Sequence, residues 1–197
     1  MLRVALTGGI ATGKSYVLDQ FRRRGIPCLD ADTLARGVTA PGTEAAAAIA
    51  GQFGPRVIAP DGTINRKALS GIVFSDAAER RVLEAIVHPA VYRAILAGLR
   101  AFELTDNPPL AIVDVPLLYE TGHEREFARV IVAICPVEIQ IERLVTRGLS
   151  REEAMRRISA QTPTEDKAAR ADYVIRTDRG FAETDRQVEE VLNNLRM

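Results

Sequence analysis

The chain is poor in cysteine. It has only two, Cys28 and Cys135, and each lies in or beside an apolar run rather than in a C-x-x-C pair or a metal-spaced cluster. Unpaired cysteine usually packs as a small apolar side chain. We therefore expect two buried free thiols and assign them no function.

An excess of charge is also missing, because 26 lysines and arginines balance 26 aspartates and glutamates. A balanced chain has no electrostatic footprint for duplex nucleic acid or an anionic membrane, so any anion-binding site must be local. No segment specifies an oligomeric state, and a monomer is the simplest expectation.

Long apolar runs are absent as well. Stretches such as residues 129–135 fall short of the roughly 20 residues that span a bilayer. Met1-Leu2-Arg3 does not open a signal peptide, because a glycine-rich turn interrupts the apolar run after Thr7. We expect a cytoplasmic protein with no membrane partner and no nucleic-acid partner.

What the sequence does contain is typical of a soluble α/β protein. It has 197 residues, 47% of them hydrophobic and 26% charged, which suits one domain with inserted subdomains. Short apolar runs alternate with amphipathic segments, the pattern of parallel strands joined by crossover helices. The predicted strands are residues 3–6, 26–29, 110–115, 130–135 and 173–175, and helices are predicted at about 14–24 and from 181 onward.

Two segments interrupt this alternation. Residues 32–107 are mostly helical in pattern, with breaks at Pro41-Gly42, Pro60-Asp61-Gly62 and His88-Pro89. Residues 136–170 form a second helical insertion, in which Ser150 with Glu153, and Thr162 with Glu165, predict two capping boxes. The remaining residues, 1–31, 108–135 and 171–197, would then form the core.

The segment from Gly8 to Ser15 reads GGIATGKS, two glycines five apart followed by Lys and Ser. It lies between a predicted strand and a predicted helix, where backbone N–H groups can wrap a phosphate at the positive end of the helix dipole. The alternative is a glycine-rich turn beside a surface lysine. The residues expected to contact a nucleotide are Gly9, Ile10, Ala11, Thr12, Gly13, Lys14, Ser15 and Tyr16.

A phosphate loop does not by itself specify a reaction. No Asn-Lys-x-Asp or Thr-Lys-x-Asp segment for guanine is present, so a regulatory GTPase fits poorly. Helical insertions next to the sheet are what a kinase needs to hold an acceptor and to close over the phosphates. The alternatives are a kinase acting on a nucleotide, nucleoside or sugar, and a nucleotide-dependent interaction protein without catalysis.

Asp30 and Asp32 follow the second predicted strand, at the carboxyl edge where open α/β sheets bind ligands. Alternation along an extended segment would place both carboxylates on one side. Alternatively, they are a pair at the start of a helix.

The chain resembles the dephospho-coenzyme A kinase family over nearly its whole length. The residues that carry this resemblance are Leu6-Thr7-Gly8-Gly9-Ile10, the phosphate loop, Asp30-Ala31-Asp32, Pro41-Gly42, His88-Pro89, Pro116-Leu117-Leu118-Tyr119-Glu120, Arg143, Arg147, Gln161 and Ala171-Asp172-Tyr173-Val174-Ile175. The resemblance implies a P-loop kinase fold: a five-stranded, mainly parallel sheet with helices on both faces, a helical coenzyme A-binding insertion and a lid. It also implies transfer of the γ-phosphoryl group of ATP to the ribose 3′-hydroxyl of dephospho-coenzyme A.

The resemblance further suggests roles for individual residues. Asp32 matches the catalytic base, and Lys14 reaches the phosphates. Asp114 closes the apolar run of residues 111–113 and is similar to a Walker-B carboxylate, so with Ser15 it would hold Mg²⁺; packing or a buried hydrogen bond is the alternative for Asp114.

Arg143 and Arg147 stand four residues apart on a predicted helix, and we expect them to share one face and meet phosphate oxygens. The alternative is an exposed face on which the arginines pair with Glu138 and Glu142. Two segments depart from the family pattern. Ala11-Thr12 replaces the usual Gly-Ser, at an expected small cost, and residues 176–178 differ from those of relatives.

Overall fold

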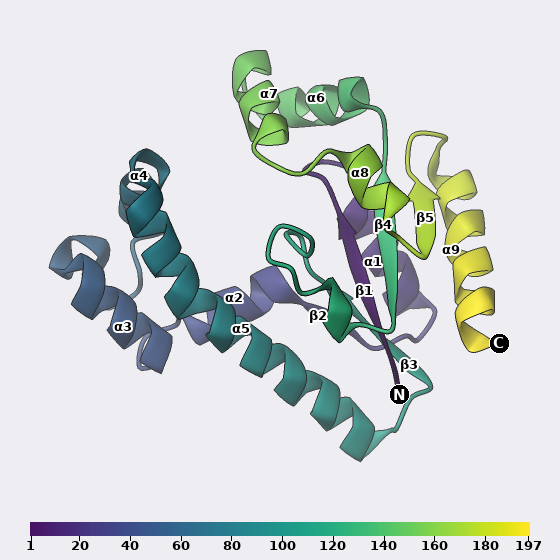
Figure 1. Ribbon diagram of the computed structural model, residues 1–197, viewed down its shortest axis with the longest axis horizontal. Helices are drawn as coiled ribbons and strands as arrows, with labels where there is room; N and C mark the ends of the chain where they lie inside the picture. Colours follow the sequence, from purple (N-terminus) through teal and green to yellow (C-terminus); the bar gives the residue numbers. More distant parts are fainter. The chain divides into compact units, whose positions relative to one another are not determined.

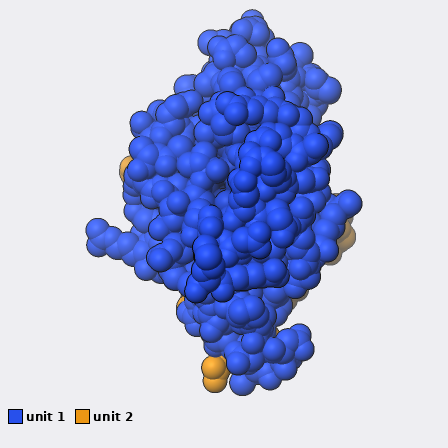
Figure 2. All heavy atoms as spheres, turned by 90° about the vertical axis from the view of Figure 1, so that its right-hand side faces the viewer, with its two compact units in different colours: residues 1–30, 102–197 blue, residues 31–101 orange.

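The computed structural model describes all 197 residues, which fall into two compact units. One unit comprises Met1–Asp30 together with Phe102–Met197, and the other comprises Ala31–Ala101. Figure 1 shows the elements along the chain, and Figure 2 colours the two units separately.

The first unit is built on a five-stranded sheet with the strand order β2-β3-β1-β4-β5. All four strand pairs are parallel, so the prediction of a mainly parallel sheet is confirmed and the sheet is entirely parallel. The strands are β1 (Leu2–Gly8), β2 (Cys28–Asp30), β3 (Leu110–Asp114), β4 (Arg129–Ile134) and β5 (Tyr173–Arg176). Each lies within about two residues of its predicted position.

Helices cover both faces of this sheet, which is why its strands are apolar at nearly every position. The helices α1 (Lys14–Arg23) and α9 (Phe181–Arg196) pack against each other and against the sheet. The short helix α8 (Thr164–Ala169) lies against β4, in front of the strands in Figure 1, whereas α1 lies behind them. Phe21 is fully buried at the centre of this core.

The segment after β4 contains α6 (Val137–Thr146), α7 (Arg151–Ser159) and α8. The predicted capping box at Ser150 is confirmed: the Glu153 N–H donates to Ser150 Oγ at 3.2 Å, and Glu153 Oε2 accepts from the Ser150 N–H at 3.1 Å. The capping box predicted at Thr162 is wrong, because α8 starts at Thr164 after an extended Pro163. The Thr162 N–H instead donates to a carboxylate, Glu120 Oε1, at 3.1 Å.

The second unit is helical and has its own hydrophobic core. It contains α2 (Ala31–Val38), α3 (Glu44–Phe53), the 3₁₀ turn η1 (Pro55–Val57), α4 (Arg66–Ser75) and most of α5 (Ala77–Thr105). Ile49, Phe53 and Leu69 are buried in this core, and Leu83 and Ile86 of α5 pack against them. The predicted breaks at Pro41-Gly42 and at residues 60–62 are confirmed by the ends of these helices.

The predicted break at His88-Pro89 is wrong, because α5 continues through Pro89 for 29 residues. An interior proline removes one helix hydrogen bond and costs about 3 kcal/mol. Packing on both sides offsets this cost, since Leu83 and Ile86 contact the second core while Ile95 and Leu99 are buried further along the helix.

By length and composition alone, α5 could also cross a membrane, since an 18-residue window has a mean hydropathy of 1.4. This helix contains no long continuous apolar run, because polar residues such as Glu84 interrupt its apolar side chains. This is weak evidence for a membrane span, because core helices of soluble proteins pass the same test. Here Val82, Leu83, Ile86 and Val87 pack against the second core.

We predict that Phe21→Ala lowers the free energy of unfolding of the first unit by about 3–5 kcal/mol, because it leaves a cavity in a fully packed core. The matched control is Phe74→Ala, since Phe74 of α4 is 83% exposed. Urea unfolding followed by circular dichroism measures both. A Phe21 variant as stable as the control would show that this core does not determine stability.

Candidate active site

The phosphate loop joins the end of β1 to the start of α1, as its sequence predicts. Gly8 must be glycine, because a Cβ there would lie 2.6 Å from the carbonyl oxygen of Ala133 on β4. Gly13 adopts φ 84° just before α1, a left-handed conformation that glycine takes without steric cost. A Cβ at Gly13 would also come within 3.0 Å of Thr177 Oγ1.

Ala11 adopts φ 60°, so an alanine occupies a left-handed position in this loop. A residue with a Cβ pays roughly 1–2 kcal/mol in this conformation. The replacement of the family's glycine is therefore more costly than the sequence suggested. Contacts around the loop must stabilise it enough to offset this conformational cost at Ala11.

Arg143 supplies several of these contacts from α6. Its Nη1 donates to the Ala11 carbonyl at 3.0 Å and to Thr177 Oγ1 at 3.1 Å, and its Nη2 donates to the Thr177 carbonyl at 2.7 Å. Thr177 Oγ1 in turn donates to the Thr12 carbonyl at 2.6 Å. Arg143 is half-buried, so these bonds are partly shielded from water.

This support decides where the loop's amides point. In a trans peptide the C=O and N–H groups point in opposite directions. Because Thr177 holds the Thr12 carbonyl, the Gly13 N–H points away from Thr177, toward the side where an anion can bind. Arg143 therefore lies on the carbonyl side of the loop, whereas the sequence suggested an arginine that reaches phosphate oxygens directly.

Arg147 has different surroundings from Arg143. It is exposed and lies one residue beyond the end of α6, next to Gly148 with φ 92°. The expectation that the two arginines share one face of a helix is wrong, because α6 ends at Thr146, between them. Hydrogen bonds to the loop are found for Arg143.

Lys14 forms an ion pair with Asp114, and both oxygens of the carboxylate accept from its ammonium group. Asp114 is 4% exposed and ends β3, where it is in register with Leu6 of β1. The sequence anticipated a carboxylate at this strand end but not its pairing with the loop lysine.

Ser15 and Asp114 fit a Mg²⁺ ion, because hydroxyl and carboxylate oxygens are the hard donors that this ion prefers. Ser15 is exposed in the first turn of α1. No group of three or more His, Cys, Asp or Glu side chains is arranged so that it could hold a metal ion. Two protein oxygens suffice for Mg²⁺, which usually keeps several waters and binds phosphate oxygens.

Asp30 and Asp32 do not alternate along one strand, so that expectation is wrong. Asp30 ends β2, in register with Asp114 of β3, and α2 begins at Ala31. Asp32 therefore lies in the first turn of a helix, where a carboxylate is favoured by the helix dipole, and its side chain is exposed. The helix-start alternative describes this segment correctly.

Tyr16, which the sequence placed near the nucleotide, faces α9. Its hydroxyl donates to Asp185 at 2.7 Å, and this hydrogen bond raises the pKa of the phenol. The ring also packs against Phe181, with centroids 4.8 Å apart.

The two cysteines are free, as expected, although only Cys135 is fully buried. Desolvation raises the pKa of Cys135, and that of the half-buried Cys28 to about 12. In both cases burial favours the neutral thiol over the thiolate.

Sequence reasoning assigned no role to Gln161, which contacts the loop, or to a buried ion pair near it in the chain. Gln161 Oε1 accepts the Ile10 N–H at 2.8 Å, and Lys167 pairs with Glu120 at 2.7 Å although its side chain is fully buried. Gln161 and Glu120 appeared in the family motifs, but nothing in the sequence marked Lys167 as buried. A cavity of about 370 Å³ lies beside Gly9 and Gln161.

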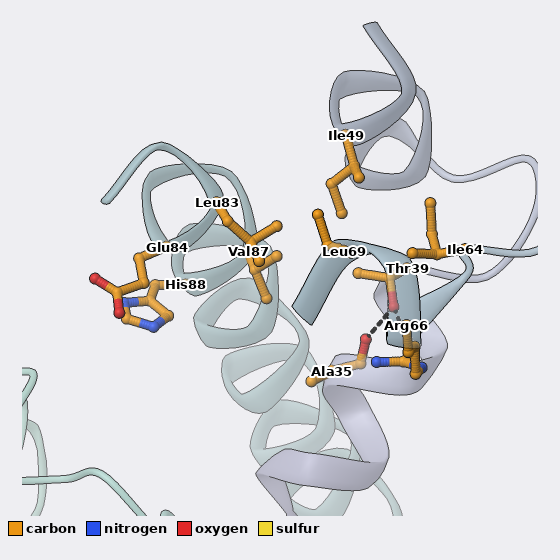
Figure 3. A pocket seen from close by; sticks show the side chains of 10 residues that line it. All are labelled: Ala35, Thr39, Ile49, Ile64, Arg66, Leu69, Leu83, Glu84, Val87 and His88. Atoms are coloured by element: carbon orange, nitrogen blue, oxygen red, sulfur yellow. Dashed lines mark hydrogen bonds between the residues drawn. The ribbon is translucent and has the colours of Figure 1, made fainter. Parts of the chain in front are cut away.

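A second cavity, of about 200 Å³, lies inside the second unit (Figure 3). Its walls are mostly apolar, with Ile49, Ile64 and Leu69 on one side. Arg66 donates to Thr39 Oγ1 at 3.0 Å, and His88 stands beside Glu84 on α5, both pointing away from Arg66 in Figure 3.

Comparison with known proteins agrees with this geometry. The family model described as dephospho-CoA kinase matches residues 2–183. The dephospho-CoA kinase of Anaeromyxobacter dehalogenans is 50% identical over 173 residues, covering 87% of this chain and 82% of that protein.

Two solved structures extend the agreement to the fold. The Thermus thermophilus protein TT1252 aligns with a TM-score of 0.82 and 33% identity, covering 98% of this chain and 96% of its own. The dephospho-CoA kinase from Campylobacter jejuni aligns with a TM-score of 0.73 and 26% identity over the same shares. Sequence, fold and phosphate loop lead to one assignment: the chain belongs to the dephospho-CoA kinase family.

Proposed function

We propose that this chain transfers the γ-phosphoryl group of ATP to the ribose 3′-hydroxyl of dephospho-coenzyme A, giving coenzyme A and ADP. Family membership makes it an ATP-dependent kinase. The observation that carries the proposal is the phosphate loop, whose carbonyls are held from behind by Arg143 and Thr177 and whose lysine meets a buried carboxylate.

ATP would bind with its phosphates at the N-terminus of α1. Amides oriented before the ligand arrives need no reorganisation, and the helix dipole adds a favourable field. Lys14 would turn from Asp114 to the β- and γ-phosphate oxygens, exchanging one anionic partner for another. This exchange also separates the Asp114 carboxylate from the Lys14 ammonium.

Ser15 and Asp114 would hold Mg²⁺, Asp114 through water. When bound, the ion neutralises charge on the β- and γ-phosphate oxygens. Asp114 is suited to this role because its two carboxylate oxygens, which accept from Lys14, are also hard donors that a hydrated cation prefers. Its burial favours a cationic neighbour in both states, because removing one member of a buried ion pair is costly.

The acceptor would bind to the helical subdomain of residues 32–107, with its 3′-hydroxyl at Asp32. That carboxylate is exposed, as a group that meets a substrate must be, and it would orient the hydroxyl and accept its proton late in the transfer. Positioning and charge neutralisation then provide most of the catalysis.

Residues 136–170 would act as a lid. Arg147 is exposed and can turn its planar guanidinium toward phosphate oxygens when the lid closes. Arg143 would act from the other side of the loop by keeping its amides in place. We place the reaction in the cytosol and expect a monomer that binds neither nucleic acid nor membrane.

A coupled ADP-release assay with and without dephospho-coenzyme A tests the proposal. ADP release that depends on this acceptor, and on no nucleoside, nucleotide or sugar in a parallel panel, is the expected result. Preference for another acceptor would reassign the substrate. Nucleotide binding without release under any condition would point to a non-catalytic interaction protein.

We predict that Lys14→Ala lowers turnover at least about 100-fold, the effect typical of losing one preorganised charge donor. It should also destabilise the fold by about 3 kcal/mol, because the buried Asp114 carboxylate loses the ammonium group that neutralises its charge. The double variant Lys14→Ala/Asp114→Asn should recover most of the stability and none of the turnover. Stability follows from urea unfolding and turnover from ADP release.

We predict that Asp32→Asn lowers turnover by roughly two to four orders of magnitude, the range for loss of a general base, with little change in ATP affinity. Because Asp32 is exposed, the melting temperature should change little. Asp30→Asn is the matched control and should have the smaller effect on turnover. A larger loss in the Asp30 variant would move the base to that residue.

We predict that Arg143→Ala and Arg147→Ala each lower turnover more than about tenfold, through the loss of charge-assisted hydrogen bonds, but differ in stability. Arg143→Ala should cost about 2 kcal/mol of unfolding free energy, because it removes partly buried, charge-assisted hydrogen bonds to Ala11 and Thr177. Arg147→Ala should leave the melting temperature unchanged. Equal melting temperatures for both variants would contradict the supporting role of Arg143.

A further inference from the structure

Gln161 connects the segment between α7 and α8 to the phosphate loop. Its Oε1 accepts the Ile10 N–H at 2.8 Å, across 151 positions of the chain. The side chain is half-buried and lies at the edge of the 370 Å³ cavity, so this hydrogen bond rather than tight packing fixes its position. The family assignment and the proposed transfer reaction give Gln161 no role.

The backbone amides of residues 10–16 fall into two groups. Those of Ile10, Thr12 and Tyr16 already donate within the protein, to Gln161, to the Gly9 carbonyl at 3.3 Å and to the Gly13 carbonyl at 3.0 Å. A second group has no acceptor within the chain: the amides of Ala11, Gly13, Lys14 and Ser15. Only the second group can bind a phosphate without first breaking a bond.

The segment that carries Gln161 is anchored on its other side. Glu120 accepts the neighbouring Thr162 N–H at 3.1 Å and pairs with the fully buried Lys167 at 2.7 Å. Thr164 lies so close to the loop that a Cβ on Gly9 would come within 2.9 Å of its Oγ1. The base of the lid therefore rests directly on the first half of the phosphate loop.

We propose that Gln161 is a positioning residue: its carbonyl holds the Ile10 amide out of phosphate binding and fixes the base of the lid on the loop. The Glu120–Lys167 pair keeps the segment within reach. Phosphates then bind to the second group of amides only, and the lid stays aligned with the group being transferred. This inference rests on the proposed function for its catalytic consequence, but not for the hydrogen bond itself.

The first test is amide hydrogen exchange at Ile10, resolved by NMR in the protein without nucleotide. Gln161→Ala and the equally long Gln161→Met lack the acceptor, so exchange should be at least about tenfold faster, the factor that corresponds to one hydrogen bond. Gln161→Glu keeps an acceptor and should retain the wild-type rate. Glu152→Ala, an exposed change on α7, is the control and should leave the rate unchanged.

The second test is kinetic. In the Ala and Met variants kcat should fall about tenfold or more, because the lid base loses its alignment, while KM for ATP stays within about threefold. The melting temperature should match that of Glu152→Ala. A purely structural role would instead change the melting temperature and leave kcat unaffected.

Three results would overturn the inference: unchanged Ile10 exchange in the Ala and Met variants, wild-type kcat in both, or renewed protection of the Ile10 amide when ATP is added to Gln161→Ala. The last result would make this amide a phosphate ligand. A wild-type protein that releases no ADP with dephospho-coenzyme A would defeat the proposed function, whereas the exchange result stands independently of activity.

Discussion

The direction of the peptide groups in residues 9–13 is the constraint on which the rest of the site depends. An amide can be turned toward an anion only if the carbonyl on the other side of the same peptide finds a donor. Arg143 of α6 and Thr177 after β5 provide those donors. Elements far apart in the sequence are therefore needed to present one short loop, and the strained conformation of Ala11 persists because its carbonyl is held.

The same loop organises charge in a chain whose formal net charge is zero. Asp114 ends a central strand and neutralises Lys14, so a strong local field exists without an overall excess of either sign. Glu120, after β3, and Lys167 of α8 form a second pair. Both pairs are largely shielded from water. The stability that depends on such a buried pair falls sharply when one partner is removed, but changes little with salt concentration.

Much of the fold could be predicted from the sequence because it depends on local patterns. Apolar runs identified the five strands, and the spacing of glycines with Lys14 located the phosphate loop. The errors arose where distant contacts override local preference. Pro89 stays inside α5 because both halves of that helix are packed, and Thr162 fails to cap α8 because Glu120 takes its amide.

The site shows the same division between local and distant information. Residue types suited to binding phosphate and Mg²⁺ could be named from the sequence, but the partners of these residues within the fold could not. From the sequence alone, Arg143 is indistinguishable from a surface arginine on a helix. Its contacts with Ala11 and Thr177 are visible only in the folded structure. Similarly, no pattern of neighbours indicates that Lys167 is fully buried, since its ion pair is with a residue 47 positions earlier in the chain.

The ion pairs also determine which amines of the protein react fastest with acylating reagents. The chain has three lysines, Lys14, Lys67 and Lys167, and the first and last are shielded and paired with carboxylates. Acylating agents should therefore react with the exposed Lys67 of α4 and with the N-terminal amine faster than with Lys14 or Lys167. The rate at which Lys14 is acylated therefore reports how often its ammonium group separates from Asp114.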